Sequence, residues 1–160
     1  FQAEDGIRDY KVTGVQTCAL PICDNLLLAL QQSGLNPAQR RARAEQLVNE
    51  FHLTPFLDRR GFQLSGGERR RSEVARALAV GEQGPQYLLL DEPFAGVDPL
   101  AVADLQELIA RLRDRGMGIL ITDHNVRETL SITHRAYILT EGSILASGPS
   151  DEMEIGRAHV

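Results

Sequence analysis

LSGGERRR at residues 64–71 and YLLLDEP at residues 87–93 are the two strings around which the rest of the sequence is organised. The leucines of the second string are typical of a strand buried on both faces, as in a parallel α/β sheet. Asp91 and Glu92 stand where this strand ends, and open α/β sheets bind ligands at the carboxyl ends of their strands. Taken alone, an acidic pair followed by Pro93 is equally typical of a solvated turn.

The first string predicts the start of a helix. Ser65, followed three residues later by Glu68, forms a capping box. Gly66 and Gly67 would let another group approach the backbone closely, and the free amides at a helix start attract phosphate. An ordinary capped helix also explains this tetrapeptide, so its meaning depends on the motifs around it.

Taken together, the motifs resemble those of the ATP-binding-cassette (ABC) ATPases. Residues 64–67 match the family signature, and residues 88–92 match the Walker B strand with its catalytic glutamate. Residues 95–98 match the D-loop, and His124 matches the switch histidine. The longer strings at 91–99 and 122–130 are similar to the ATPases of bacterial lipopolysaccharide export systems.

This resemblance implies an enzyme that hydrolyses ATP with Mg²⁺ at the interface of two copies paired head to tail. Asp91 would help to hold Mg²⁺. Glu92 would polarise the attacking water, and His124 would contact the γ-phosphate as a sensor.

The signature motif would serve the other copy of the dimer. By the same resemblance, Ser65, Gly66 and Gly67 would contact the γ-phosphate bound to the partner, and Asp98 would link the two ATP sites. Two transmembrane permease subunits would complete the transporter, which extracts lipopolysaccharide from the inner membrane. The ATPase would be peripheral, on the cytoplasmic face of that membrane.

Composition is consistent with these partners. The 160-residue chain has a formal net charge of −5, which gives no electrostatic reason to expect nucleic acid as a partner. No apolar run approaches the roughly 20 residues that a membrane span needs. Any membrane role would therefore come through the permease subunits.

The two ends of the chain do not resemble the family. Residues 1–22 and 154–160 resemble a conceptual translation of sequencing-adapter DNA and are set apart from fold reasoning; a disordered N-terminal extension is the alternative for the first. The only lysine, Lys11, lies there, and no glycine-rich phosphate-binding loop is present. We expect the carboxyl-side part of an ATPase without its Walker A half, inactive alone and marginally stable.

The expected fold class is α/β, a partial P-loop NTPase domain with a helical subdomain at 23–80 and the C-terminal part of a RecA-like core at 81–153. Helices are predicted near 24–31, after Asn36, after Ser65, after Asp98 and at 125–130. Strands are predicted at 88–92 and 118–122, with a hairpin joining 136–139 to 143–146.

Three alternatives remain open at this point. The first is an ATPase of the branched-chain amino-acid uptake group, which the strings at 91–99 and 124–130 disfavour. The second is a soluble ABC-type ATPase acting in DNA repair or on ribosomes; such proteins usually carry coiled-coil insertions, tandem cassettes or basic patches, and none is visible. The third is a chain with no catalytic role.

Overall fold

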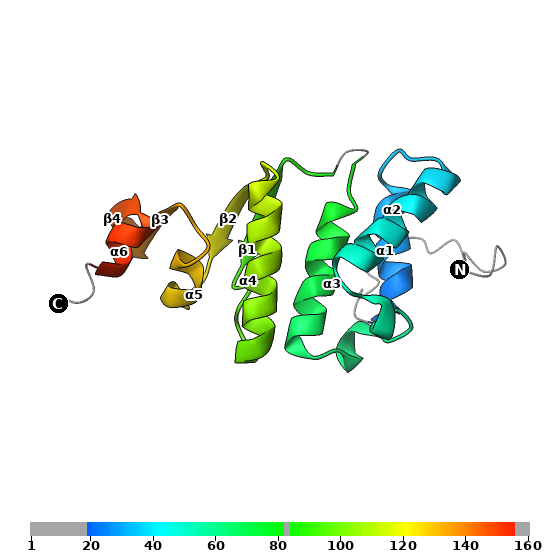
Figure 1. Ribbon diagram of the computed structural model, residues 1–160, viewed down its shortest axis with the longest axis horizontal. Helices are drawn as coiled ribbons and strands as arrows, with labels where there is room; N and C mark the ends of the chain where they lie inside the picture. Colours follow the sequence, from blue (N-terminus) through cyan, green and yellow to red (C-terminus); the bar gives the residue numbers. More distant parts are fainter. Residues whose placement is uncertain (1–18, 82–83, 156–160) are drawn as a thin grey trace.

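The computed structural model describes residues 19–81 and 84–155. A helical part lies at one end, a two-stranded parallel sheet with its helix lies in the middle, and an antiparallel hairpin lies at the other end (Figure 1). Within these residues, no helix is both long and apolar enough to cross a membrane.

The helical part contains α1 (Ile22–Gln31), α2 (Pro37–Glu50) and α3 (Gly66–Leu78), with the short 3-10 turns η2 (Thr54–Phe56) and η3 (Gly61–Gln63) between α2 and α3. Asn36 caps α2 through a capping box with Gln39, as its position before Pro37 predicts. The predicted apolar stripe of α2 is buried against α1 and α3, and its members are Ala44, Leu47, Val48 and Phe51.

The first helix begins earlier than the sequence predicts. Pro21 is its N-cap, so α1 starts at Ile22 instead of near Asp24. Ile22 is buried, and its amide donates to the Arg59 carbonyl at 3.1 Å. The boundary expected between residues 22 and 23 therefore falls inside a helix, and residues 1–18 lie outside the described part of the chain.

The central sheet consists of β1 (Tyr87–Asp91) and β2 (Gly118–Thr122), which run parallel and are connected through α4 (Pro99–Asp114). Asp98 caps α4 by accepting the Ala101 amide at 3.0 Å. The predicted stripe of α4 is buried, and it consists of Leu105, Leu108, Ile109 and Leu112.

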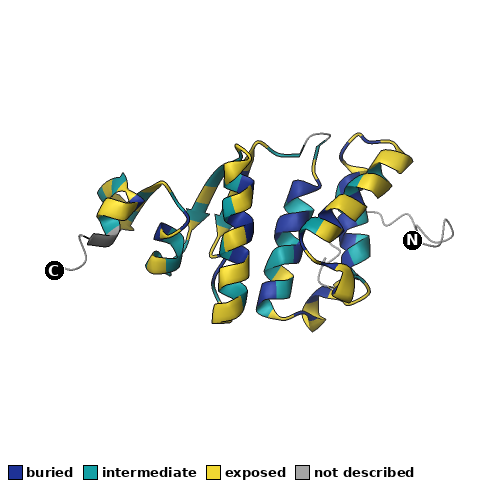
Figure 2. Ribbon diagram, viewed as in Figure 1, coloured by how far each residue is buried: buried dark blue, intermediate teal, exposed yellow. Residues whose placement is uncertain are grey.

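The expectation that β1 is buried on both faces is wrong. Leu88 is 4% exposed and belongs to the main core, whereas its neighbour Leu89 is 72% exposed. Leu120, which pairs with Leu89 in β2, is also exposed. Helices therefore cover one face of the sheet, and the other face is open to solvent, as the exposed stretches of β1 and β2 show in Figure 2.

The C-terminal part contains α5 (Val126–Leu130), the antiparallel hairpin β3 (Arg135–Thr140) with β4 (Ser143–Pro149), and α6 (Ser150–Ile155). Glu141 and Gly142 both have positive φ, as the two-residue turn of a hairpin requires. Helix α6 is not among the elements expected from the sequence. The side chain of Ser150, at its start, is buried and lies 2.8 Å from the Thr133 hydroxyl.

Candidate functional site at the carboxyl edge of the parallel sheet

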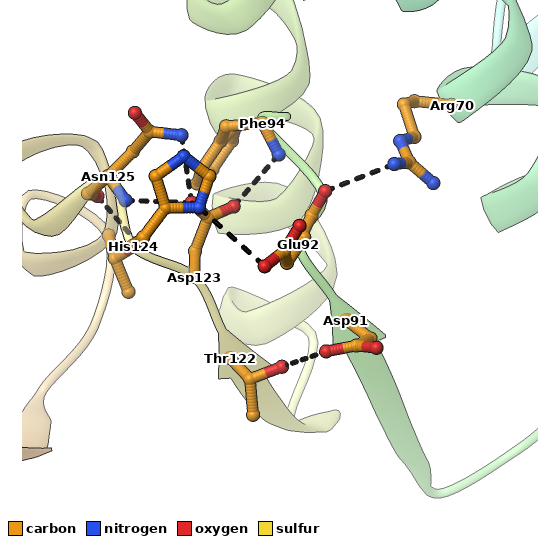
Figure 3. Close-up of polar contacts among 9 residues, drawn as sticks. Arg70, Asp91, Glu92, Phe94, Thr122, Asp123, His124 and Asn125 are labelled. Atoms are coloured by element: carbon orange, nitrogen blue, oxygen red, sulfur yellow. Dashed lines mark hydrogen bonds and ion pairs between the residues drawn. The ribbon is translucent and has the colours of Figure 1, made fainter. Parts of the chain in front are cut away.

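The parallel register of β1 and β2 brings the predicted catalytic residues to one edge. Asp91 lies opposite Thr122, and the Thr122 hydroxyl donates to the Asp91 carboxylate. Glu92 follows β1 and His124 follows β2 two residues after its last member. Two residues distant in sequence therefore meet at the carboxyl ends of neighbouring strands (Figure 3).

Glu92 and His124 lie within ion-pair distance. Nδ1 of His124 is 3.7 Å from Oε1 of Glu92, and both side chains are more than half exposed. Both groups are therefore accessible to a substrate that approaches this edge of the sheet. This pair is the part of the candidate site that the sequence predicted most fully.

The backbone of Glu92 has an unusual conformation. Its φ is +46°, in the left-handed region that residues other than glycine seldom adopt. Its amide donates to the Thr122 carbonyl at 2.7 Å, and its carbonyl accepts from the Arg70 guanidinium at 3.1 Å. Such strain costs on the order of 1–3 kcal/mol and persists where the surroundings over-determine it, most often at functional sites.

Arg70 and Asp123 also hold the site. From the sequence, the arginines at 69–71 are expected to point largely to solvent or to a partner, and Asp123 has no expected role. Arg70 lies on α3, the signature helix, where it pairs with Glu73 at 2.9 Å. Its hydrogen bond to the Glu92 carbonyl ties this helix to the end of β1. The Asp123 carboxylate is 0% exposed and accepts three hydrogen bonds, from the Phe94 amide and from the backbone and side-chain amides of Asn125. The Asp-x-Asn spacing is typical of an Asx turn and is the signal that could have identified Asp123.

The signature residues form a second group, against the start of α4. The Ser65 hydroxyl accepts the Glu68 amide at 3.3 Å, and the Glu68 carboxylate accepts the Ser65 amide at 2.9 Å, which confirms the capping box. A Cβ on Gly66 would lie 2.6 Å from the Gly96 carbonyl oxygen, and one on Gly67 would lie 2.5 Å from the Ala101 Cβ. The glycines therefore allow α3 to approach the D-loop and α4 closely.

Asp91 is the residue expected to hold magnesium. Asp91 is exposed and is paired with the Thr122 hydroxyl. The described residues contain no cluster of three or more His, Cys, Asp or Glu side chains that could hold a metal by themselves. Mg²⁺ in nucleotide sites is commonly held by one or two carboxylates together with substrate phosphates and water, and the donors at this edge fit that shared arrangement.

A parallel-sheet edge carrying Asp91, Glu92 and His124, beside a capped glycine helix, is the arrangement of an ABC-type ATP-binding cassette. The sequence profile described as ABC transporter matches residues 8–95, more than half of the chain, and the match begins within the segment that the sequence analysis sets apart. The chain belongs to the ABC transporter family, so the predicted family and fold class are confirmed.

Relatives with known names agree with the predicted subfamily. The chain is 55% identical over 130 residues to the lipopolysaccharide export system ATP-binding protein LptB of Acidithiobacillus ferridurans, covering 81% of this chain and 53% of that protein. It is 52% identical over 135 residues to LptB of Escherichia coli K12, covering 84% and 55%. The chain thus spans about half the length of the curated relatives it matches.

Solved structures confirm the fold. A nucleotide-free ATP-binding cassette from an ABC transporter superposes with a TM-score of 0.74 at 24% identity, covering 90% of this chain and 61% of that one. A dimeric ATP-binding cassette in a post-hydrolysis state, bound to ADP and Pi, gives 0.69 at 24% identity, covering 84% and 60%. At these identities the likeness concerns the fold alone.

Proposed function

We propose that this chain carries the signature and Walker B half of the ATP-hydrolysing subunit of a lipopolysaccharide export transporter. The observation that supports it most is the placement of Glu92 and His124, 3.7 Å apart at the carboxyl edge of β1 and β2. Identity at about half of the aligned positions with two export ATPases supports the subfamily.

In this proposal Glu92 and His124 divide the chemistry of hydrolysis. The exposed Glu92 carboxylate orients and polarises the attacking water, because it is an acceptor at the edge where the substrate would lie. His124 donates a hydrogen bond to the γ-phosphate and reports its presence. Hydrogen bonds at both ends of the Glu92 backbone, from Arg70 and to Thr122, fix the backbone from which the carboxylate projects, and groups positioned in advance lower the cost of reaching the transition state.

Asp91 would hold Mg²⁺ together with the phosphates of ATP. The bound ion supplies positive charge that offsets the negative charge of the transferring phosphoryl group. The Thr122 hydroxyl, which donates to Asp91, keeps that carboxylate turned toward the sheet edge.

A second copy would complete each ATP site. The first amides of α3, at Gly66 and Gly67, have no acceptor one turn earlier in their helix and are suited to an anion. Ser65 and these two amides would contact the γ-phosphate held by the partner of a head-to-tail dimer. Asp98, at the start of α4, would link the two sites, and two transmembrane permease subunits would place the dimer at the cytoplasmic face of the inner membrane.

Replacing the matching half of the E. coli relative with residues 21–153, which keep the N-cap and first residue of α1, tests this function in cells. We expect the chimera to restore lipopolysaccharide export in a strain depleted of its own ATPase, and the Glu92→Gln chimera to fail at equal abundance. A chimera that hydrolyses ATP but does not restore export would contradict the export assignment and favour an ATPase of the branched-chain amino-acid importer type or a non-transport ABC ATPase. A Glu92→Gln chimera as active as its parent would contradict the catalytic assignment.

A further inference from the structure

The turn from Glu92 to Phe94 is held from two sides. On one side, Arg70 of the signature helix donates to the Glu92 carbonyl at 3.1 Å. On the other side, the Phe94 amide donates to the Asp123 carboxylate at 3.0 Å, across 29 residues of sequence. These contacts flank the catalytic glutamate, and the second comes from the residue next to His124 (Figure 3).

Burial of a carboxylate at position 123 has a free-energy cost. Its carboxylate is fully buried, and a buried charge is tolerated only when it is paired or hydrogen-bonded. One oxygen accepts the Phe94 amide, while the other accepts the Asn125 amide and side chain, both at 2.8 Å. Hydrogen bonds to a charged acceptor are roughly twice as strong as neutral ones, so one side chain locks two loops together.

The same carboxylate also lies beside the switch histidine. Oδ1 of Asp123 is 3.7 Å from Nδ1 of His124, the same separation as that between His124 and Glu92. The backbone between Asp123 and Asn125 is closed by the Asx turn, and His124 is its middle residue. Fixing this turn therefore limits the direction in which the imidazole can project.

We propose that Asp123 is a positioning residue that fastens the Glu92–Phe94 turn to the His124 loop and so sets the separation of Glu92 and His124. This role of Asp123 rests on the proposed function, in which Glu92 and His124 act on ATP. A simpler role, in which Asp123 only closes its own Asx turn, would involve Asn125 but not Phe94.

Selective labelling of the full 160-residue chain distinguishes the two roles. A sample with ¹⁵N-phenylalanine and ring-¹³C-histidine reports the Phe94 amide and the His124 imidazole by NMR. Asp123→Asn keeps the shape of the side chain but removes its charge and one acceptor. Asp104→Asn, at an exposed position of α4, is the matched control for the change in charge.

We expect Asp123→Asn to raise hydrogen exchange at the Phe94 amide by about tenfold or more, as loss of a charge-assisted hydrogen bond requires, and to shift the His124 ring signal. Asp104→Asn should leave both unchanged. An unchanged Phe94 amide and His124 ring in Asp123→Asn would overturn the proposal, whatever the variant does to the midpoint of thermal unfolding.

A second variant keeps the proposal testable if Asp123→Asn fails to fold. Asn125→Ala removes one of the three donors, and we expect a smaller change at the same two signals; no change at either would overturn the proposal. These signals are recorded without ATP. The failure of the chimera to support export would therefore contradict the proposed function and leave the coupling of the two loops standing.

Discussion

Replacing Gly67 with alanine probes the close approach of the signature helix to α4. The added Cβ would lie 2.5 Å from the Cβ of Ala101, far inside van der Waals contact. Overpacking of this kind costs about 1–3 kcal/mol, whereas exchanging glycine for alanine in a helix returns up to about 1 kcal/mol. We therefore expect Gly67→Ala to lower the free energy of unfolding by about 1 kcal/mol, measured by urea denaturation followed by circular dichroism.

The partner of the clash supplies the control. Ala101→Gly removes the opposing Cβ but keeps the amide that donates to Asp98, and it costs about 1 kcal/mol through helix propensity alone. The double variant should then be more stable than the sum of the two single effects, by about 1 kcal/mol of favourable coupling. Strictly additive effects would refute the packing of α3 on α4 described above.

Three further results follow from the sequence and the structure. The purified 160-residue chain should release no phosphate from ATP above background in a coupled assay, because it has no P-loop lysine or glycine-rich loop. Leu88→Ala should destabilise the chain by about 2–5 kcal/mol in urea denaturation, since Leu88 is buried, whereas Leu89→Ala on the open face should change stability little. Burial, reinforced by the charge of Asp24, raises the pKa of the Cys23 thiol, so in a Cys18→Ser background iodoacetamide should alkylate Cys23 more slowly at pH 8 in the folded chain than in urea.

Each of these three predictions has an outcome that would contradict it. If the chain hydrolyses ATP steadily and Glu92→Gln abolishes this turnover, hydrolysis needs no part of the ATPase outside this chain. Equal losses of stability in Leu88→Ala and Leu89→Ala would mean that both faces of the sheet are covered. Equal alkylation rates in the folded and unfolded chains would contradict the burial of Cys23. The raised pKa of Cys23 also makes stability depend on pH. The contribution of the buried Cys23 thiol to the free energy of unfolding is complete below the ordinary thiol pKa, and it is lost as pH rises through the higher pKa of the folded state.

Local rules were sufficient for most of the helices. The caps at Asn36, Ser65 and Asp98 depend on side chains and amides three residues apart, so the sequence states them directly. The hairpin around Glu141 and Gly142 follows from a two-residue turn. Helix α1 starts two residues before the predicted start near Asp24. Its N-cap, Pro21, makes no side-chain capping hydrogen bond, so no capping signal in the sequence marks this start.

The site was predictable only where it repeats a family motif. Glu92 and His124 were found through their strings, but the contacts that hold them are between distant segments. The donor from Arg70 crosses 22 residues, and the acceptor in Asp123 crosses 29; no local rule links such positions. The all-apolar string of β1 has no period that distinguishes one covered face from two, so the exposure of Leu89 depends on which strands and helices lie beside it.

We propose Glu92 as the catalytic carboxylate of an ABC-type ATPase. The decisive measurement is steady-state phosphate release from the purified chimera that joins the upstream half of the E. coli relative to residues 21–153. We expect ATP-dependent turnover that falls by about 10²- to 10⁴-fold in Glu92→Gln, the usual contribution of a positioned general base, with the variant still folded. Turnover that is unchanged in Glu92→Gln would contradict it.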